Sequence, residues 1–81
     1  MLTIFGKNNC PKCEQAKNLI NMYGYPASEW EYINLESEEG SVFVERVAKD
    51  GRDMPAVYDG DARMGGVNEL QKYLLAWRKN A

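Results

Sequence analysis

The segment Cys10-Pro11-Lys12-Cys13 decides how the rest of the chain is interpreted. It follows the apolar run Leu2-Thr3-Ile4-Phe5, which predicts a strand, and it begins a helical pattern that extends to Tyr23. Pro11 suits the first helical position because its missing N–H would have no partner there. A C-x-x-C pair between a first strand and a first helix is typical of a thiol–disulfide redox site. The unpaired N–H groups and partial positive charge of the helix N-terminus stabilise a thiolate, which is the reactive form in disulfide exchange.

The two cysteines occupy unequal positions on the predicted helix. Cys10 falls at the N-cap, whereas Cys13 falls on the apolar stripe that continues through Ala16. We therefore expect Cys10 to be exposed and to act as the nucleophile, and Cys13 to be buried and to act as the resolving thiol. Lys7 and Lys12 lie close to Cys10 in the sequence, and nearby ammonium groups would lower the pKa of its thiol further.

Composition indicates a small enzyme that works in a reducing compartment. The 81 residues suffice for one domain, which we place at 1–81, and 44% apolar residues suffice for a small core. The formal charge of −2 and the lack of a Lys/Arg run disfavour nucleic-acid binding. The strand pattern begins at once and no apolar stretch could span a bilayer, so we expect no signal peptide, no membrane association and a cytoplasmic location.

A structural disulfide and a metal site are the alternatives for the cysteine pair. A disulfide across so short a loop would stabilise the fold by only about 2 kcal/mol, and the cytosol would tend to reduce it. Structural zinc takes four Cys or His ligands, and the chain has two cysteines and no histidine. We therefore expect a redox site and no metal.

The remaining pattern alternates strands and helices in the order β-α-β-α-β-β-α. The segment 41–50 also has strand character, but we predict a helix because a parallel strand pair needs a crossover of this length. Asp59-Gly60-Asp61 is a hairpin signal between two short apolar segments. Asn68 and Gln71 suggest a capping box that begins the last helix. The predicted elements are strands at 2–5, 31–35, 56–58 and 62–64, and helices at 11–23, 41–50 and from 68 onward.

This order, the C-P-x-C segment, Met54-Pro55 before the third strand and Gly65-Gly66 before the last helix together resemble the glutaredoxins, over nearly the whole chain. The resemblance implies a thioredoxin-like α/β fold with a four-stranded mixed sheet and three helices. It also implies a glutathione-dependent thiol–disulfide oxidoreductase, with Cys10 and Cys13 catalytic, glutathione as reducing co-substrate and no bound cofactor.

The resemblance assigns a glutathione site as well. It implies a cis Met54-Pro55 bond whose preceding backbone pairs with the tripeptide, a cationic anchor near the nucleophile, and a helix start that receives the γ-glutamyl end. The residues so implied are Lys7, Lys12, Met54, Pro55, Gly66, Val67, Asn68 and Glu69. Asp53 departs from the threonine usual in the family, and its charge would weaken the binding of anionic glutathione unless Arg52 offsets it.

Two other functions remain open at this point. One is a small redoxin recharged by thioredoxin reductase, although such proteins usually carry a different segment at 65–69. The other is a module that binds an iron–sulfur cluster between two subunits, against which Pro11 argues by family analogy. For the favoured function we expect a monomer whose clients are disulfide-containing or glutathionylated proteins, with ribonucleotide reductase a client typical of the family.

Overall fold

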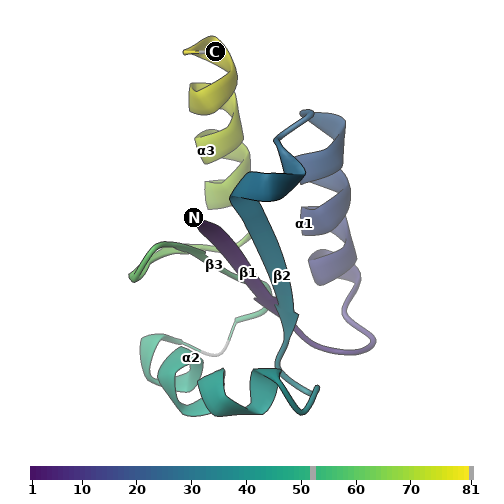
Figure 1. The fold of residues 1–81 in the computed structure, drawn as a ribbon, viewed down its shortest axis with the longest axis vertical. Helices are drawn as coiled ribbons and strands as arrows, with labels where there is room; N and C mark the ends of the chain where they lie inside the picture. Colours follow the sequence, from purple (N-terminus) through teal and green to yellow (C-terminus); the bar gives the residue numbers. More distant parts are fainter. Residues whose placement is uncertain (52, 81) are drawn as a thin grey trace.

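The computed structural model describes residues 1–51 and 53–80. Within this part of the chain, three α-helices and four strands follow one another in the predicted order (Figure 1). Short 3-10 turns precede the second strand and the second helix. The elements are β1 (Leu2–Gly6), α1 (Pro11–Met22), η1 (Ala27–Glu29), β2 (Trp30–Asn34), η2 (Gly40–Phe43), α2 (Val44–Asp50), β3 (Ala56–Asp59), β4 (Ala62–Gly65) and α3 (Val67–Lys79).

The strands form one mixed sheet in the order β2-β1-β3-β4. β1 pairs with β2 in parallel and with β3 antiparallel, and the β3–β4 hairpin is antiparallel. Gly60 provides the positive φ of 61° that the hairpin turn needs. The predicted four-stranded mixed sheet with three helices is therefore confirmed.

Each face of the sheet buries a different set of side chains. Leu2 and Ile4 of β1 point to the face covered by α1 and α3, where they pack with Ile20 and Leu74. Phe5, in the opposite alternation, packs with residues of β3 and α2 on the other face. Figure 1 shows α1 and α3 together and α2 apart from them. The sheet is thus the middle layer of three.

Helix α1 begins at Pro11 as predicted and ends at Met22, with Tyr23 as its C-cap. Pro11 is its first residue, and Cys13, Ala16 and Ile20 form its buried stripe. Just after the helix, Gly24, with φ of 70°, donates its N–H to the carbonyl of Asn21. The N–H of Tyr25 donates to the carbonyl of Ile20 at 3.2 Å. These two bonds satisfy carbonyls that the helix leaves unpaired, and they need a residue that tolerates positive φ.

Two boundary predictions need correction. The helix predicted at 41–50 is confirmed as a helix, but 40–43 form a 3-10 turn and the α-helix begins only at Val44. Helix α3 begins at Val67, with Gly66 as its N-cap, so the capping box predicted for Asn68 and Gln71 is wrong. The cap uses the carboxylate of Glu69 instead, three residues after Gly66.

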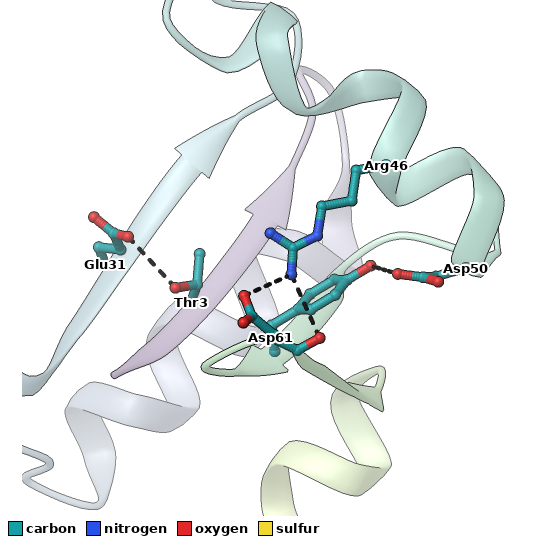
Figure 2. Close-up of polar contacts among 6 residues, drawn as sticks. Thr3, Glu31, Arg46, Asp50 and Asp61 are labelled. Atoms are coloured by element: carbon teal, nitrogen blue, oxygen red, sulfur yellow. Dashed lines mark hydrogen bonds and ion pairs between the residues drawn. The ribbon is translucent and has the colours of Figure 1, made fainter.

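Helix α2 is held to the sheet by polar contacts as well as by its buried Val47 (Figure 2). The buried Tyr58 of β3 donates its hydroxyl hydrogen to Asp50 Oδ2 at 2.5 Å. Arg46 lies over the Tyr58 ring and pairs with Asp61 at 3.2 Å. Burial, and next the hydrogen bond to Asp50, raises the pKa of Tyr58 above its ordinary value.

Tyr58→Phe tests this attachment. We expect it to lower the free energy of unfolding by about 1 kcal/mol, because one hydrogen bond is lost while the ring stays. The raised pKa in the folded state means that neutral Tyr58 contributes stability near pH 7 and that this contribution is lost as the pH rises through the folded-state value. In urea unfolding, the free energy of unfolding of the variant should therefore decline less above pH 10 than that of the wild type. Asp61→Asn, which breaks an exposed ion pair, is the control with little expected effect.

Candidate active site

Cys10 is the N-cap of α1, as predicted. Its backbone is extended, with φ of −121° and ψ of 97°, and its Sγ accepts the N–H of Cys13 at 3.2 Å. Its carbonyl accepts the N–H of Glu14 at 3.2 Å, which is the first bond of the helix. The sulfur therefore takes the position that a serine or aspartate oxygen takes in an ordinary N-cap. Cys10 and Cys13 are joined in a disulfide.

The exposure predicted for Cys10 needs correction. Cys10 is only 9% exposed, and Cys13 is 0% exposed. Cys10 is covered because its sulfur is bonded to Cys13 and lies over the first turn of α1 instead of pointing into solvent. The predicted difference between the two holds nevertheless: Cys10 borders a surface cavity, and Cys13 belongs to the buried stripe of α1.

Sheet topology brings three distant segments to this point. β3 is antiparallel to β1, so its start lies beside the end of β1, with Ala56 opposite Phe5. β4 is antiparallel to β3, so its end lies beside the start of β3, with Gly65 opposite Val57. The loop after β1, the loop before β3 and the start of α3 therefore meet at one end of the sheet.

Two adjoining cavities occupy this end of the sheet. The smaller, the Cys10 cavity, has a volume of about 490 Å³. The larger, the long groove, has a volume of about 680 Å³ and extends to the start of α3. They share Lys12, Asp53 and Met54. The Cys10 cavity is lined by Lys7, Asn9, Cys10, Pro11, Lys12, Asp53 and Met54; the long groove is lined by Lys12, Gln15, Asp50, Gly51, Asp53, Met54, Pro55, Arg63, Gly65, Gly66, Val67, Asn68 and Glu69.

All the residues expected to bind glutathione therefore border these two cavities. Lys7 lies at the Cys10 end, and Gly66 to Glu69 lie at the far end. The Met54-Pro55 bond is cis, as predicted. Asp53, the departure from the family pattern, borders both cavities, while Arg52 lies outside the described residues.

The glycine pair between β4 and α3 has two different roles. Gly65 has φ of 137°, which L side chains rarely adopt, and a Cβ there would lie 2.7 Å from the carboxyl carbon of Glu69. Gly66 is the N-cap of α3, and its N–H donates to Glu69 Oε1 at 2.9 Å. The Glu69 carboxylate therefore lies directly on the backbone of the pair.

Sequence reasoning missed Arg63, Asp50 and Gln15 as lining residues of the long groove. Arg63 Nη2 donates to the backbone oxygen of Asp53 at 3.3 Å. Its Nη1 is buried and has no hydrogen-bond partner within 1–51 and 53–80. The one sequence signal that could have placed Arg63 here is the alternation along β4, which puts Arg63 and Met64 on opposite faces of the sheet.

Neither a metal centre nor a membrane span is visible in the described parts of the chain. No group of three or more Cys, His, Asp and Glu side chains in 1–51 and 53–80 is placed to hold a metal ion. Over the same residues, no helix has the length and apolarity needed to cross a bilayer.

Comparison with known proteins relates this site to one family. No protein-family model matches the chain. Glutaredoxin-1 of vaccinia virus is 26% identical over 73 residues, which cover 85% of this chain and 67% of the viral protein.

Two solved structures share the fold. A buckwheat glutaredoxin–glutathione complex has a TM-score of 0.69 at 20% identity, covering 96% of this chain and 78% of that one. The glutaredoxin-like NrdH-redoxin of Escherichia coli has a TM-score of 0.66 at 24% identity, covering 93% and 91%. The sequence relative, these two structures and the cysteine pair at the start of α1 agree: the chain is similar to glutaredoxins in sequence, has the thioredoxin-like fold and is a thiol–disulfide oxidoreductase.

Proposed function

We propose that this oxidoreductase takes its electrons from glutathione and reduces protein disulfides and glutathionylated thiols. The observation that carries the proposal is that two adjoining cavities, which share Lys12, Asp53 and Met54 as lining residues, lie between Cys10 and the start of α3. An extended tripeptide with a carboxylate at each end needs a cation near the reacting sulfur, backbone to pair with, and an anion site at the far end. Lys7, the Met54-Pro55 backbone and the N-terminus of α3 supply these in that order.

The reaction begins with the reduced protein. The Cys10 thiolate attacks one sulfur of a client disulfide, forms a mixed disulfide and releases the first client thiolate. The Cys13 sulfur, after losing its proton to solvent, then attacks Cys10 Sγ, releases the second client thiolate and forms the Cys10–Cys13 disulfide. Two electrons have passed from the protein to the client, and the structure describes the protein in this oxidised state.

Glutathione returns the two electrons. One glutathione thiolate attacks Cys10 Sγ, which releases Cys13 and leaves glutathione bonded to Cys10. A second attacks the sulfur of the bound glutathione, which releases oxidised glutathione and the Cys10 thiolate. A glutathionylated client needs Cys10 alone, because its glutathione passes directly to Cys10.

The proposal extends to the setting of the reaction. Residues 1–81 act as a single domain and as a monomer, in a reducing compartment such as the cytosol, where glutathione is abundant. The clients are proteins with disulfides or glutathionylated cysteines, and ribonucleotide reductase is the client class to test first because the family resemblance implies it.

The first test is the source of electrons. With NADPH and a small disulfide substrate, turnover should require glutathione plus glutathione reductase, and thioredoxin reductase should not replace them. Lys7→Gln should raise the KM for glutathione by about threefold to tenfold, since it removes one charge-assisted bond worth about 1 kcal/mol at a partly exposed site. Lys49→Gln, an equal charge change in the last turn of α2, is the control. Efficient turnover with thioredoxin reductase alone would instead support the redoxin alternative.

The second test separates the cysteines. Cys10→Ser should reduce both activities to background, because the N-cap sulfur is the only one that attacks a substrate. Cys13→Ser should retain turnover of glutathionylated substrates and lose the reduction of protein disulfides that depends on two thiols. Steady-state assays with a glutathionylated peptide and with a disulfide-bonded protein measure the two routes. Equal losses in the two variants would show that the assignment of roles is wrong.

A further inference from the structure

The guanidinium of Arg63 lies against the backbone just before Met54. Its Nη2 donates to the carbonyl oxygen of Asp53 at 3.3 Å. Its Nη1 is buried, and a Cβ on Gly51 would lie 2.8 Å from it. Gly51 has φ of 139°, a conformation that L side chains rarely adopt. The guanidinium therefore fills the space that a side chain at position 51 would need.

Arg63 reaches this position from the middle of β4. It pairs with Tyr58 across the hairpin, so both side chains lie on the face of the sheet that α2 covers. The half-buried Arg63 also lines the long groove together with Asp53 and Met54. The side chain thus connects the sheet to the backbone that borders the groove.

The bond to Asp53 also fixes the direction of the next N–H along the chain. Among the described residues the cis bond follows Met54, so the Asp53–Met54 peptide is trans. In a planar trans peptide the C=O and the N–H point in opposite directions and turn together. Within 1–51 and 53–80, the N–H of Met54 donates to no backbone acceptor. By holding the carbonyl of Asp53, Arg63 therefore aims an N–H that is available to a ligand.

We propose that Arg63 is a positioning residue that holds the Asp53–Met54 peptide plane so that the Met54 N–H pairs with the backbone of a substrate. The inference rests on the proposed function, in which an extended peptide lies against Met54-Pro55. Without Arg63 the plane would take several orientations, and the apparent affinity would fall in proportion to the fraction of molecules that are competent to bind. The role covers glutathione and protein clients alike, because both present peptide groups beside the reacting disulfide.

Two uncharged disulfides separate this role from a general effect of the positive charge. The disulfide of N-acetylcysteine N-methylamide has peptide groups on both sides of each cysteine, whereas 2-hydroxyethyl disulfide has none. Both react by the same steps: the Cys10 thiolate attacks one sulfur and releases a thiolate, and Cys13 then attacks Cys10 Sγ and releases the second. The measurement is the rate constant for oxidation of the reduced protein, from acid-quenched samples analysed by mass spectrometry.

Arg63→Gln, whose shorter amide does not reach the carbonyl, should lower the rate constant for the peptide disulfide by about threefold to tenfold. This loss corresponds to a plane that is competent in about a third to a tenth of the molecules. The rate constant for 2-hydroxyethyl disulfide should stay close to the wild-type value. Arg63→Met, which keeps an apolar stem, should give the same result, and Arg63→Lys should recover most of the loss because one donor is enough for one carbonyl.

Arg46→Gln is the matched control, because it removes the same charge from α2 above the Tyr58 ring and leaves Asp53 alone (Figure 2). It should react with both disulfides like the wild type. The amide of Met54 reports the plane directly. In Arg63→Gln its ¹⁵N heteronuclear NOE should fall below the wild-type value, while that of the buried Ala56 in β3 should not change.

Three results would overturn the inference. Equal slowing with both disulfides would show a general defect of the site. No slowing with the peptide disulfide would show that the plane does not depend on Arg63. A full loss in Arg63→Lys would show that the bond to Asp53 is not the cause. Oxidised glutathione tests the proposed function separately: if it reacts with the wild type no faster than the uncharged peptide disulfide does, the glutathione site fails, while the role of Arg63 is still decided by the two uncharged disulfides.

Discussion

The bond from the Cys13 N–H to the Cys10 sulfur is the interaction on which the proposed chemistry depends. It places the sulfur at the N-cap of α1, where the helix offers N–H groups and partial positive charge to an anion. Strand β1, an inner strand of the sheet, ends at Gly6, and the short loop after it carries Cys10 to the start of α1. The burial of Cys13, Ala16 and Ile20 then sets the rotation of the helix.

The same topology explains why so small a protein can present an extended binding surface. Antiparallel pairing places the end of β1, the start of β3 and the end of β4 side by side. The segments next to these strand ends supply a thiol, the backbone of Met54-Pro55 and a helix N-terminus, respectively. Helix α2, on the other face, supports the arrangement through the bond between Tyr58 and Asp50 and contributes Asp50 to the groove wall.

Much of this could be predicted from the sequence because the relevant signals are local. The N-cap position of Cys10, the buried stripe of α1 and the hairpin turn at Gly60 each depend on a few neighbouring residues. The four-stranded mixed sheet and the cis bond at Met54-Pro55 were predictions from the family resemblance. The site roles implied by that resemblance remain predictions, although the residues do border adjoining cavities.

What the sequence did not reveal depends on side-chain placement in three dimensions. Asn68 and Gln71 match a capping box, yet Glu69 takes the cap because the helix begins one residue earlier. Arg63 was unremarkable as one residue of a short strand, but the pairing of β3 with β4 puts it beside the backbone of Asp53. The small exposure of Cys10 follows from its bonded sulfur lying over the first turn of α1, which a position at the N-cap does not determine.

We infer that the N-cap position makes Cys10 a thiolate at neutral pH. The most direct measurement is the rate of alkylation of Cys10 by iodoacetamide against pH, on the reduced Cys13→Ser variant. We expect a midpoint well below the value of about 8.5 of an unperturbed thiol. A midpoint at or above that value would contradict it, and would show that the carboxylate of Asp53 outweighs the helix N-terminus and the neighbouring lysines.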